Sequence, residues 1–168
     1  GISFSSVGSA MMHEVQITGL ERFTTYYYQA ITGQASSTIQ SFKTPPFASD
    51  EQSFRFVAMS DMQKSSADPL KYDEVIHDGV LDYLEQNLTG VASEDLALVL
   101  IPGDLVDSGN SYGQWEDDFF QYSTDLFGKV PVYPVLGNHE TNTQYYFQYF
   151  HLPENGTDGY EEHWWWKD

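Results

Sequence analysis

Three strand-like runs in the second part of the chain each end at a cluster of polar residues, and this repeat restricts the possible folds most. The runs cover residues 53–59, 96–101 and 130–136. The segments between them, about 69–88 and 112–127, carry apolar residues at the spacing of an amphipathic helix. Strand, helix, strand, helix, strand in this order predicts right-handed crossover connections, and therefore an α/β layer around a parallel sheet.

The residues that follow the strands are rich in oxygen and nitrogen donors. In chain order they are Asp61 and Gln63, Asp104 and Asp107, and Asn138 and His139. A single aspartate after a strand is more often a helix cap, and a single Asn-His pair is usually a turn. Because the carboxyl ends of parallel strands meet at one edge of a sheet, three such clusters favour a ligand site there.

The first part of the chain has a different pattern. Residues 13–18, 25–31 and 38–43 alternate between apolar and polar side chains, and turn residues separate them. This spacing predicts short strands belonging to part of an antiparallel β-sandwich. We therefore divide the chain into residues 1–46 and 47–168, with strands that merely flank the main domain as the alternative interpretation.

Charge and composition exclude several classes of function. The chain carries 25 acidic and 7 basic residues, for a net charge of −18, which disfavours nucleic acid and anionic membranes as partners. The same charge repels a phosphate ester, so a site for one needs local positive charge, which bound metal would supply. Cysteine is absent, which excludes disulfides and thiolate chemistry. No run reaches the roughly 18–20 apolar residues of a membrane-spanning helix.

The polar clusters resemble the motifs of a known family. Ser60-Asp-Met-Gln63, Gly103-Asp-Leu-Val-Asp107 and Gly137-Asn-His-Glu140 are similar, in order and spacing, to the first three motifs of calcineurin-like metallophosphoesterases. Leu20 and Tyr26 resemble the tyrosine corner of fibronectin type III-like domains. A module of that kind in front of the phosphoesterase domain is the layout of purple acid phosphatases.

The resemblance implies a fold and a set of metal ligands. Residues 47–168 would form the N-terminal part of a metallophosphoesterase domain, and residues 1–46 the last strands of a fibronectin type III-like module. Asp61 would bind the first of two metal ions, with Gln63 beside it. Asp104 would bridge both ions, and Asn138 would bind the second one through its side-chain oxygen. Iron, manganese, zinc and magnesium all suit such ligands.

The resemblance also implies a reaction. His139 would approach the phosphoryl oxygens or the leaving group as a hydrogen-bond donor or general acid. Asp107 would accept a hydrogen bond from His139 and fix its tautomer. The substrate would be a phosphomonoester or phosphodiester, hydrolysed by in-line attack of a hydroxide that the two metals activate.

The sequence departs from the family pattern at three points. Gln63 stands where the family usually has histidine, which indicates a harder ion such as manganese, magnesium or calcium, or a weak site. Asp107 stands where purple acid phosphatases have a tyrosine ligand, so we expect no purple colour. No Gly-His-x-His motif follows His139, and His163 is interpreted as a structural residue. We therefore expect a fragment with an incomplete site and little or no activity of its own.

Two other functions remain open from the sequence. A noncatalytic binding module with a degenerate site is favoured by Gln63 and by the missing histidines. A carbohydrate-active protein with two acidic catalytic residues is a weaker alternative, because no acidic pair is singled out by its spacing. Export from the cell is expected from the resemblance to secreted acid phosphatases and from the lack of cysteine.

Overall fold

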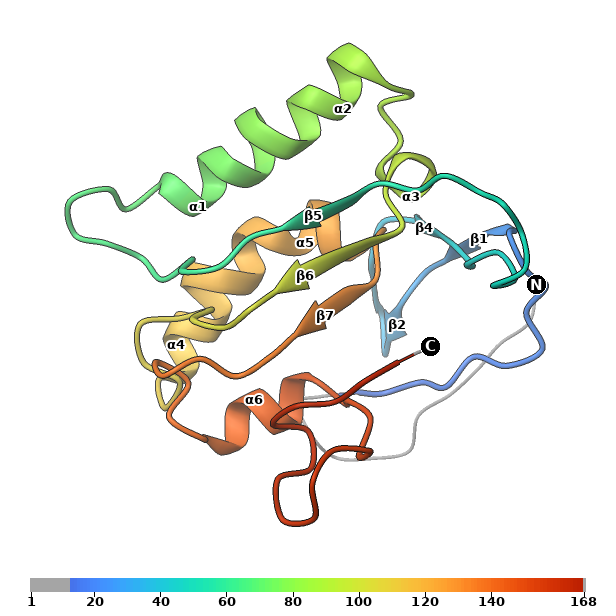
Figure 1. Cartoon of the computed structure of the whole chain (residues 1–168). Helices are drawn as coiled ribbons and strands as arrows, with labels where there is room; N and C mark the ends of the chain where they lie inside the picture. Colours follow the sequence, from blue (N-terminus) through green and yellow to red (C-terminus); the bar gives the residue numbers. More distant parts are fainter. Residues whose placement is uncertain (1–12, 168) are drawn as a thin grey trace.

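A three-stranded parallel sheet lies at the centre of the molecule. The computed structural model describes residues 13–167 (Figure 1). The sheet has the order β5 (Phe56–Ala58), β6 (Leu98–Ile101) and β7 (Val132–Pro134), and both neighbouring pairs are parallel. Val57 of β5 pairs with Val99 of β6, which pairs with Val132 of β7. The predicted α/β layer with a parallel sheet is confirmed, although each strand is shorter than the run that predicted it.

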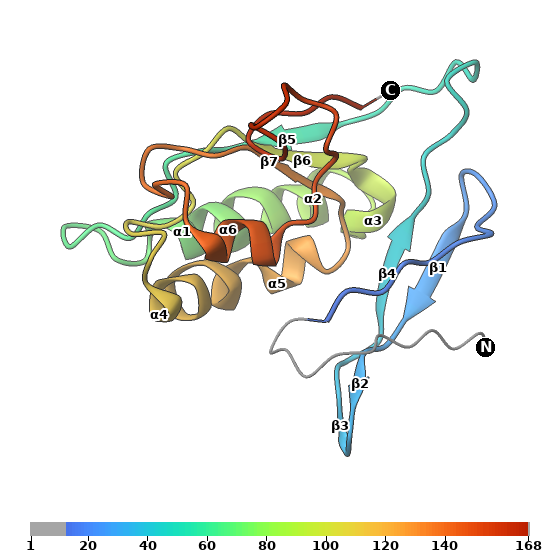
Figure 2. The same ribbon diagram turned by 90° about the horizontal axis from the view of Figure 1, so that it is seen from below.

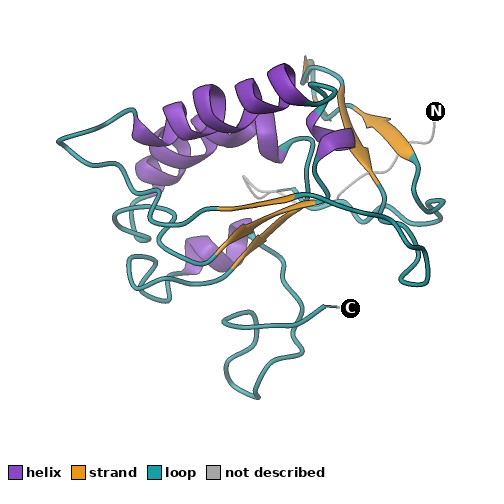
Figure 3. Ribbon diagram, turned by 45° about the horizontal axis from the view of Figure 1, so that its top comes forward, coloured by secondary structure: helices purple, strands orange, loops and turns teal. Residues whose placement is uncertain are grey.

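Two long helical segments connect the strands, as the apolar spacing predicts, and each has a π-helical middle part. The first consists of α1 (Lys71–Glu74), η1 (Val75–Leu81) and α2 (Asp82–Asn87), and the second of α4 (Tyr112–Gln114), η2 (Trp115–Phe120) and α5 (Gln121–Phe127). The short helix α3 (Ala92–Asp95) precedes β6, and α6 (Gln144–Tyr149) follows β7. After α6 the described chain forms only loops and turns (Figure 3).

The hydrophobic core lies between the helices and one face of the sheet (Figure 2). Val99 on β6 and Trp115 and Phe119 on η2 are fully buried. The rings of Trp115 and Phe119 meet edge to face with centroids 5.9 Å apart, a favoured arrangement of aromatic pairs. Tyr146 of α6 is also fully buried, so the aromatic residues of α6 belong to a helix that packs on the core.

The other face of the sheet is apolar and open. Side chains alternate along a strand, so Phe56 and Leu100 point away from the face that carries Val57 and Val99. Phe56 is 52% exposed and Leu100 is 37% exposed, while Phe54, just before β5, is 68% exposed. Parallel sheets are usually covered on both faces, so this open apolar face is unusual.

The first part of the chain forms two small antiparallel pairs. Strand β1 (Thr25–Tyr28) pairs with β4 (Gln40–Lys43), and β2 (Ile31–Thr32) pairs with β3 (Ala35–Ser36). The strand predicted at residues 13–18 is wrong, because this segment forms no strand and leaves the apolar side chains of Val15 and Ile17 exposed. Alternation alone does not form a strand where no neighbouring strand is available.

This first part contacts the α/β layer through polar groups. The Lys43 ammonium lies 2.6 Å from the Glu94 carboxylate of α3. The Tyr28 hydroxyl donates to the carbonyl oxygen of Gly128, at the end of α5, over 2.6 Å. Strands β1 and β4 lie at one side of the molecule (Figure 2).

Tyr26 makes the hydrogen bond for which a tyrosine corner is named. Its hydroxyl accepts the backbone N–H of Glu21 over 2.8 Å, five residues upstream. The assignment of residues 1–46 to a fibronectin type III-like module stays a prediction, since it includes residues outside the described part. No helix within residues 13–167 has the length and apolar character needed to cross a membrane.

Candidate metal centre

The loops that follow the three parallel strands meet at one edge of the sheet (Figure 1). The first loop is tied to the second, because the N–H of Met62 donates to the carbonyl oxygen of Asp104 over 2.9 Å. The second is tied to the third, because the N–H of His139 donates to Oδ1 of Asp104 over 3.1 Å. All three predicted clusters therefore lie in loops that contact one another.

Two of the predicted ligands have an unusual backbone conformation. Asp61 has φ of 55° and Asp104 has φ of 56°, both in the left-handed region. Aspartate tolerates this region better than most residues, although it still costs on the order of 1 kcal/mol. Each aspartate turns the chain directly after its strand. Strained residues of this kind cluster at functional sites, which supports a ligand role for both.

Glycines allow the second and third loops to touch. A Cβ atom on Gly137 would lie 2.0 Å from Oδ1 of Asp104. Gly103, with φ of 93°, lies so close that its Cβ would be 2.7 Å from the Cα of Gly137. The glycines that precede Asp104 and Asn138 are thus required, because at these positions backbone packs directly on backbone and on the Asp104 carboxylate.

The ring of His139 is held by the main chain of the second loop. Its Nδ1 lies 2.8 Å from the carbonyl oxygen of Asp107. A carbonyl can only accept, so Nδ1 carries the hydrogen and Nε2 is the nitrogen left for a ligand. The carboxylate of Asp107 is farther away, with Oδ1 3.6 Å from Nδ1, and it is 59% exposed. Asp107 therefore accepts the expected hydrogen bond through its backbone.

The surroundings of His139 favour its protonated form. The hydrogen bond to the Asp107 backbone raises its pKa above the ordinary value, burial opposes this, and the charges of Asp104, Asp107 and Glu140 each add a smaller upward effect. A histidine of this kind can donate a proton or a charged hydrogen bond.

Glu140 belongs to the site although sequence reasoning gave it no role. Its side chain is fully buried and accepts four backbone N–H groups from two loops. The donors are Asp104, Leu105 and Val106 after β6 and Gly137 after β7. The sequence signal for it was its position at the end of the Gly137-Asn-His-Glu140 motif.

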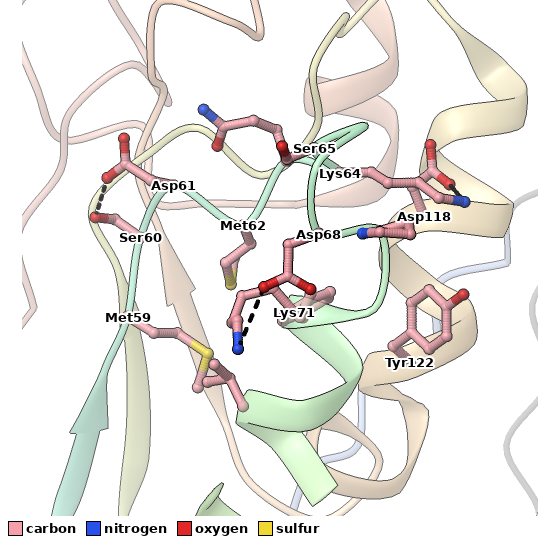
Figure 4. A pocket seen from close by; sticks show the side chains of 14 residues that line it. Met59, Ser60, Asp61, Met62, Lys64, Ser65, Asp68, Lys71, Asp118 and Tyr122 are labelled. Atoms are coloured by element: carbon pink, nitrogen blue, oxygen red, sulfur yellow. Dashed lines mark hydrogen bonds and ion pairs between the residues drawn. The ribbon is translucent and has the colours of Figure 1, made fainter.

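Asp61 and Gln63 line a pocket of about 270 Å³ (Figure 4). Oδ2 of Asp61 accepts the hydroxyl of Ser60 over 2.6 Å. The side-chain oxygen of Gln63 is buried, and no described protein group donates to it. A buried acceptor without a donor is costly, and a cation would satisfy it.

The lysines of this pocket are already paired with acids. Lys64 lies 2.9 Å from Asp118, and Lys71 lies 3.4 Å from Asp68 and 2.6 Å from Glu74 (Figure 4). Neighbouring carboxylates therefore offset part of the positive charge of both ammonium groups.

The predicted donors fit a hard cation. Asp61 and Asp104 supply carboxylate oxygens, while Gln63 and Asn138 supply amide oxygens, the ligand types that magnesium, calcium and manganese prefer. Within residues 13–167, no three histidine, aspartate or glutamate side chains come together as a metal group. His163 lies elsewhere, with its ring 5.1 Å from that of Phe147, which agrees with its structural interpretation.

Fold and donor set define an α/β protein with an oxygen-rich site at the carboxyl edge of a parallel sheet. Within this class, the chain belongs to the calcineurin-like phosphoesterase family, whose sequence profile matches residues 54–166, more than half of the chain. The family implies divalent metal ions as cofactors. Residues 13–53 lie outside the matched segment.

Similar proteins carry acid phosphatase names. The chain is 29% identical over 132 residues to purple acid phosphatase 22 of Arabidopsis thaliana, which covers 79% of this chain and 25% of that protein. An acid phosphatase of Aspergillus ficuum is 44% identical over 61 residues, 35% of this chain and 10% of that protein. The chain thus spans about a quarter or less of these relatives.

A solved structure shares the fold. The purple acid phosphatase PPD1 from yellow lupin (Lupinus luteus) seeds superposes with a TM-score of 0.60 at 18% identity, covering 83% of this chain and 28% of that chain. At this identity the likeness concerns the fold alone.

Proposed function

We propose that the protein containing this chain hydrolyses phosphate esters with the help of metal ions bound at the edge of the sheet. The observation that carries the proposal is the direct contact between the second and third loops, in which the N–H of His139 donates to the Asp104 carboxylate. This contact joins the side chain of a predicted ligand to the backbone of the predicted proton donor, which supports the proposal. The family and the acid phosphatase names of the relatives support the same reaction class.

Asp61, Gln63, Asp104 and Asn138 would hold two metal ions, with Asp104 shared between them. Bound divalent ions neutralise phosphate oxygens and lower the pKa of a water molecule. The protein's own contribution is to hold these oxygen donors in place, because phosphoryl transfer relies on positioning and charge neutralisation. A chain of net charge −18 repels phosphate over longer distances, so the neutralisation must be local.

His139 would act on the substrate directly. Its Nδ1 hydrogen is engaged by the Asp107 carbonyl, so Nε2 would donate to a phosphoryl oxygen or to the oxygen of the leaving group. Nε2 can donate only while both ring nitrogens carry hydrogen, because Nδ1 already donates to the Asp107 carbonyl.

The order of domains along the chain is proposed from the same family resemblance. We propose a partial fibronectin type III-like module over residues 1–46, followed by the N-terminal part of a metallophosphoesterase domain over residues 47–168. The Tyr26 hydrogen bond supports the first assignment. Export from the cell is proposed on the resemblance to secreted acid phosphatases.

Calorimetric titration of this chain with Mn²⁺ tests the metal site. We compare the natural chain with Asp104→Asn, which keeps a residue suited to positive φ, and with Asp82→Asn on α2 as a matched surface control. We expect saturable binding in the natural chain and the control, weakened at least tenfold in Asp104→Asn. Equal binding by all three proteins would contradict the assignment of Asp104.

The second candidate is a noncatalytic binding module with a degenerate site. Gln63 in place of histidine, and the lack of a three-residue metal group within residues 13–167, favour it for this chain. We accordingly expect this chain alone to hydrolyse an aryl phosphate in excess Mn²⁺ only very slowly. Turnover at about 1 s⁻¹ or more, in the normal range of enzymes, would refute that expectation.

A further inference from the structure

We propose that Glu140 is a positioning residue whose side chain fixes the distance between the loop that carries Asp104 and the loop that carries Asn138 and His139. The catalytic part of this inference rests on the proposed function. Its structural part, that Glu140 ties the two loops together, rests only on hydrogen bonds and burial.

The contacts of Glu140 join two loops that no strand pairing connects. Oε1 accepts the N–H of Leu105 over 2.8 Å and that of Val106 over 3.4 Å. Oε2 accepts the N–H of Asp104 over 3.0 Å and that of Gly137 over 2.7 Å. Oε2 thus links the backbone of a predicted ligand to the residue directly before Asn138.

Both side-chain oxygens must act as acceptors. The side chain is fully buried, so water does not replace a lost hydrogen bond without opening the loops. Glutamine has nearly the same shape but only one acceptor atom, and its NH₂ group is a donor. In either orientation, Glu140→Gln would place that NH₂ group against backbone N–H groups. The substitution therefore breaks two of the four hydrogen bonds and sets donor against donor, without creating a cavity.

The link also holds the left-handed conformation of Asp104. This residue has φ of 56°, and its own N–H is one of the four that Glu140 binds. The same loops are joined a second time, because the N–H of Gly109 donates to the His139 carbonyl over 3.0 Å. The indole N–H of buried Trp115 donates to the carbonyl of Gly109 over 2.9 Å, which anchors this second link to η2.

The test measures loop order and metal affinity separately. Amide hydrogen exchange, followed by NMR without metal, reports on the N–H groups of Asp104, Leu105 and Gly137. Mn²⁺ titration reports on the site. The variants are Glu140→Gln, the shorter acid Glu140→Asp, and Glu162→Gln as a matched control, since Glu162 also accepts a backbone N–H, that of Leu152 over 2.9 Å.

We expect Glu140→Gln to lose exchange protection at these amides and to bind Mn²⁺ about 10–100-fold more weakly. Glu140→Asp should lie between Glu140→Gln and the natural chain in both exchange protection and Mn²⁺ affinity. Glu162→Gln should match the natural chain in both. Unchanged protection in Glu140→Gln would overturn the link itself. Lost protection with unchanged Mn²⁺ affinity would overturn the positioning role.

Two further observations keep the test decisive. If the natural chain binds no Mn²⁺, the metal site proposed for this chain fails, while the exchange data still decide whether Glu140 ties the loops. If Glu140→Gln does not fold, Gly137→Ala separates the same loops with Glu140 in place, because its Cβ would meet Oδ1 of Asp104 at 2.0 Å. Mn²⁺ affinity unchanged in Gly137→Ala would show that loop spacing does not control the site.

Discussion

At the scale of single residues, the ring of His139 is oriented by a backbone carbonyl, so the Asp107 side chain is not needed for that purpose. The carboxylate is mostly exposed and lies 3.6 Å from Nδ1, beyond good hydrogen-bonding distance. Its remaining influence on His139 is the electrostatic effect of one exposed charge, which solvent screens.

Asp107→Asn should therefore change little. We expect the affinity for Mn²⁺, and the phosphatase activity of the full-length protein, to fall less than about fivefold, since an exposed pair of this type contributes roughly 0.2–1 kcal/mol. His139→Gln should lower the activity by 10²-fold or more, the usual contribution of a general acid. Steady-state kinetics of the two variants test this prediction. A loss of activity in Asp107→Asn as large as in His139→Gln would contradict the conclusion that the Asp107 carbonyl orients the ring.

At this scale the sequence indicated candidate ligands, because ligand chemistry is visible in residue type. Asp61, Asp104 and His139 stand out as donors that follow strands. Glu140 was missed, because its importance comes from four backbone groups that converge on it in space, and a pattern of side chains does not show those groups. The acceptor role of the Asp107 carbonyl was hidden for the same reason.

At the scale of elements, the two long helical segments are joined by a histidine between two acids. Nδ1 of His77 on η1 lies 2.7 Å from Oδ1 of Asp73, and Nε2 lies 3.3 Å from Oδ2 of Asp125 on α5. Both ring nitrogens can donate only when the ring is protonated. Burial lowers the pKa of His77, but the hydrogen bonds to Asp125 and Asp73 together raise it above its ordinary value.

This arrangement predicts a pH-dependent contribution to stability. A raised pKa in the folded state stabilises the protein below the unfolded-state value of about 6.5, and the effect is lost as pH rises through the folded-state pKa. Urea unfolding should therefore show a larger difference between the natural chain and His77→Gln at pH 5.5 than at pH 8.5. The ring is partly exposed, so we expect the change to be roughly 0.2–1 kcal/mol. A difference that does not vary with pH would contradict the prediction.

Elements were predicted well where the periodicity was long and poorly where it was short. The helices over 71–87 and 112–127 match their apolar spacing, since each buries a continuous stripe of side chains. Residues 13–18 alternate for only six positions and pair with no strand within residues 13–167, so the prediction failed there. The π-helical parts η1 and η2 carry no sequence signal that we recognised.

At the scale of the whole molecule, the helices within residues 13–167 cover one face of the parallel sheet and leave the other without a helix (Figure 2). On the open face, Phe56 and Leu100 are exposed, and Tyr133 is partly covered by Trp165, with ring centroids 5.4 Å apart. The indole N–H of Trp165 donates to the Pro134 carbonyl over 3.1 Å, so the segment after α6 runs beside β7. Exposed apolar patches of this kind bind apolar molecules or promote association.

We expect this chain to bind an apolar fluorescent dye such as anilinonaphthalene sulfonate in its folded state. The double substitution Phe56→Glu with Leu100→Glu should remove most of the fluorescence, because it places charge in the centre of the open face. Tyr83→Glu, at an exposed tyrosine of α2, serves as the control and should leave the fluorescence unchanged. Equal fluorescence from all three proteins would show that the dye binds elsewhere.

The positive φ angles of Asp61 and Asp104 have a consequence for the evolution of this site. Only aspartate, asparagine and glycine enter the left-handed region readily, so natural selection for folding restricts both positions before selection for metal binding acts. A homologue that has lost its metal should drift first to asparagine or glycine at these positions. An aspartate that does not vary among homologues then indicates metal binding. A mixture of these three residues indicates only that the backbone keeps its left-handed conformation.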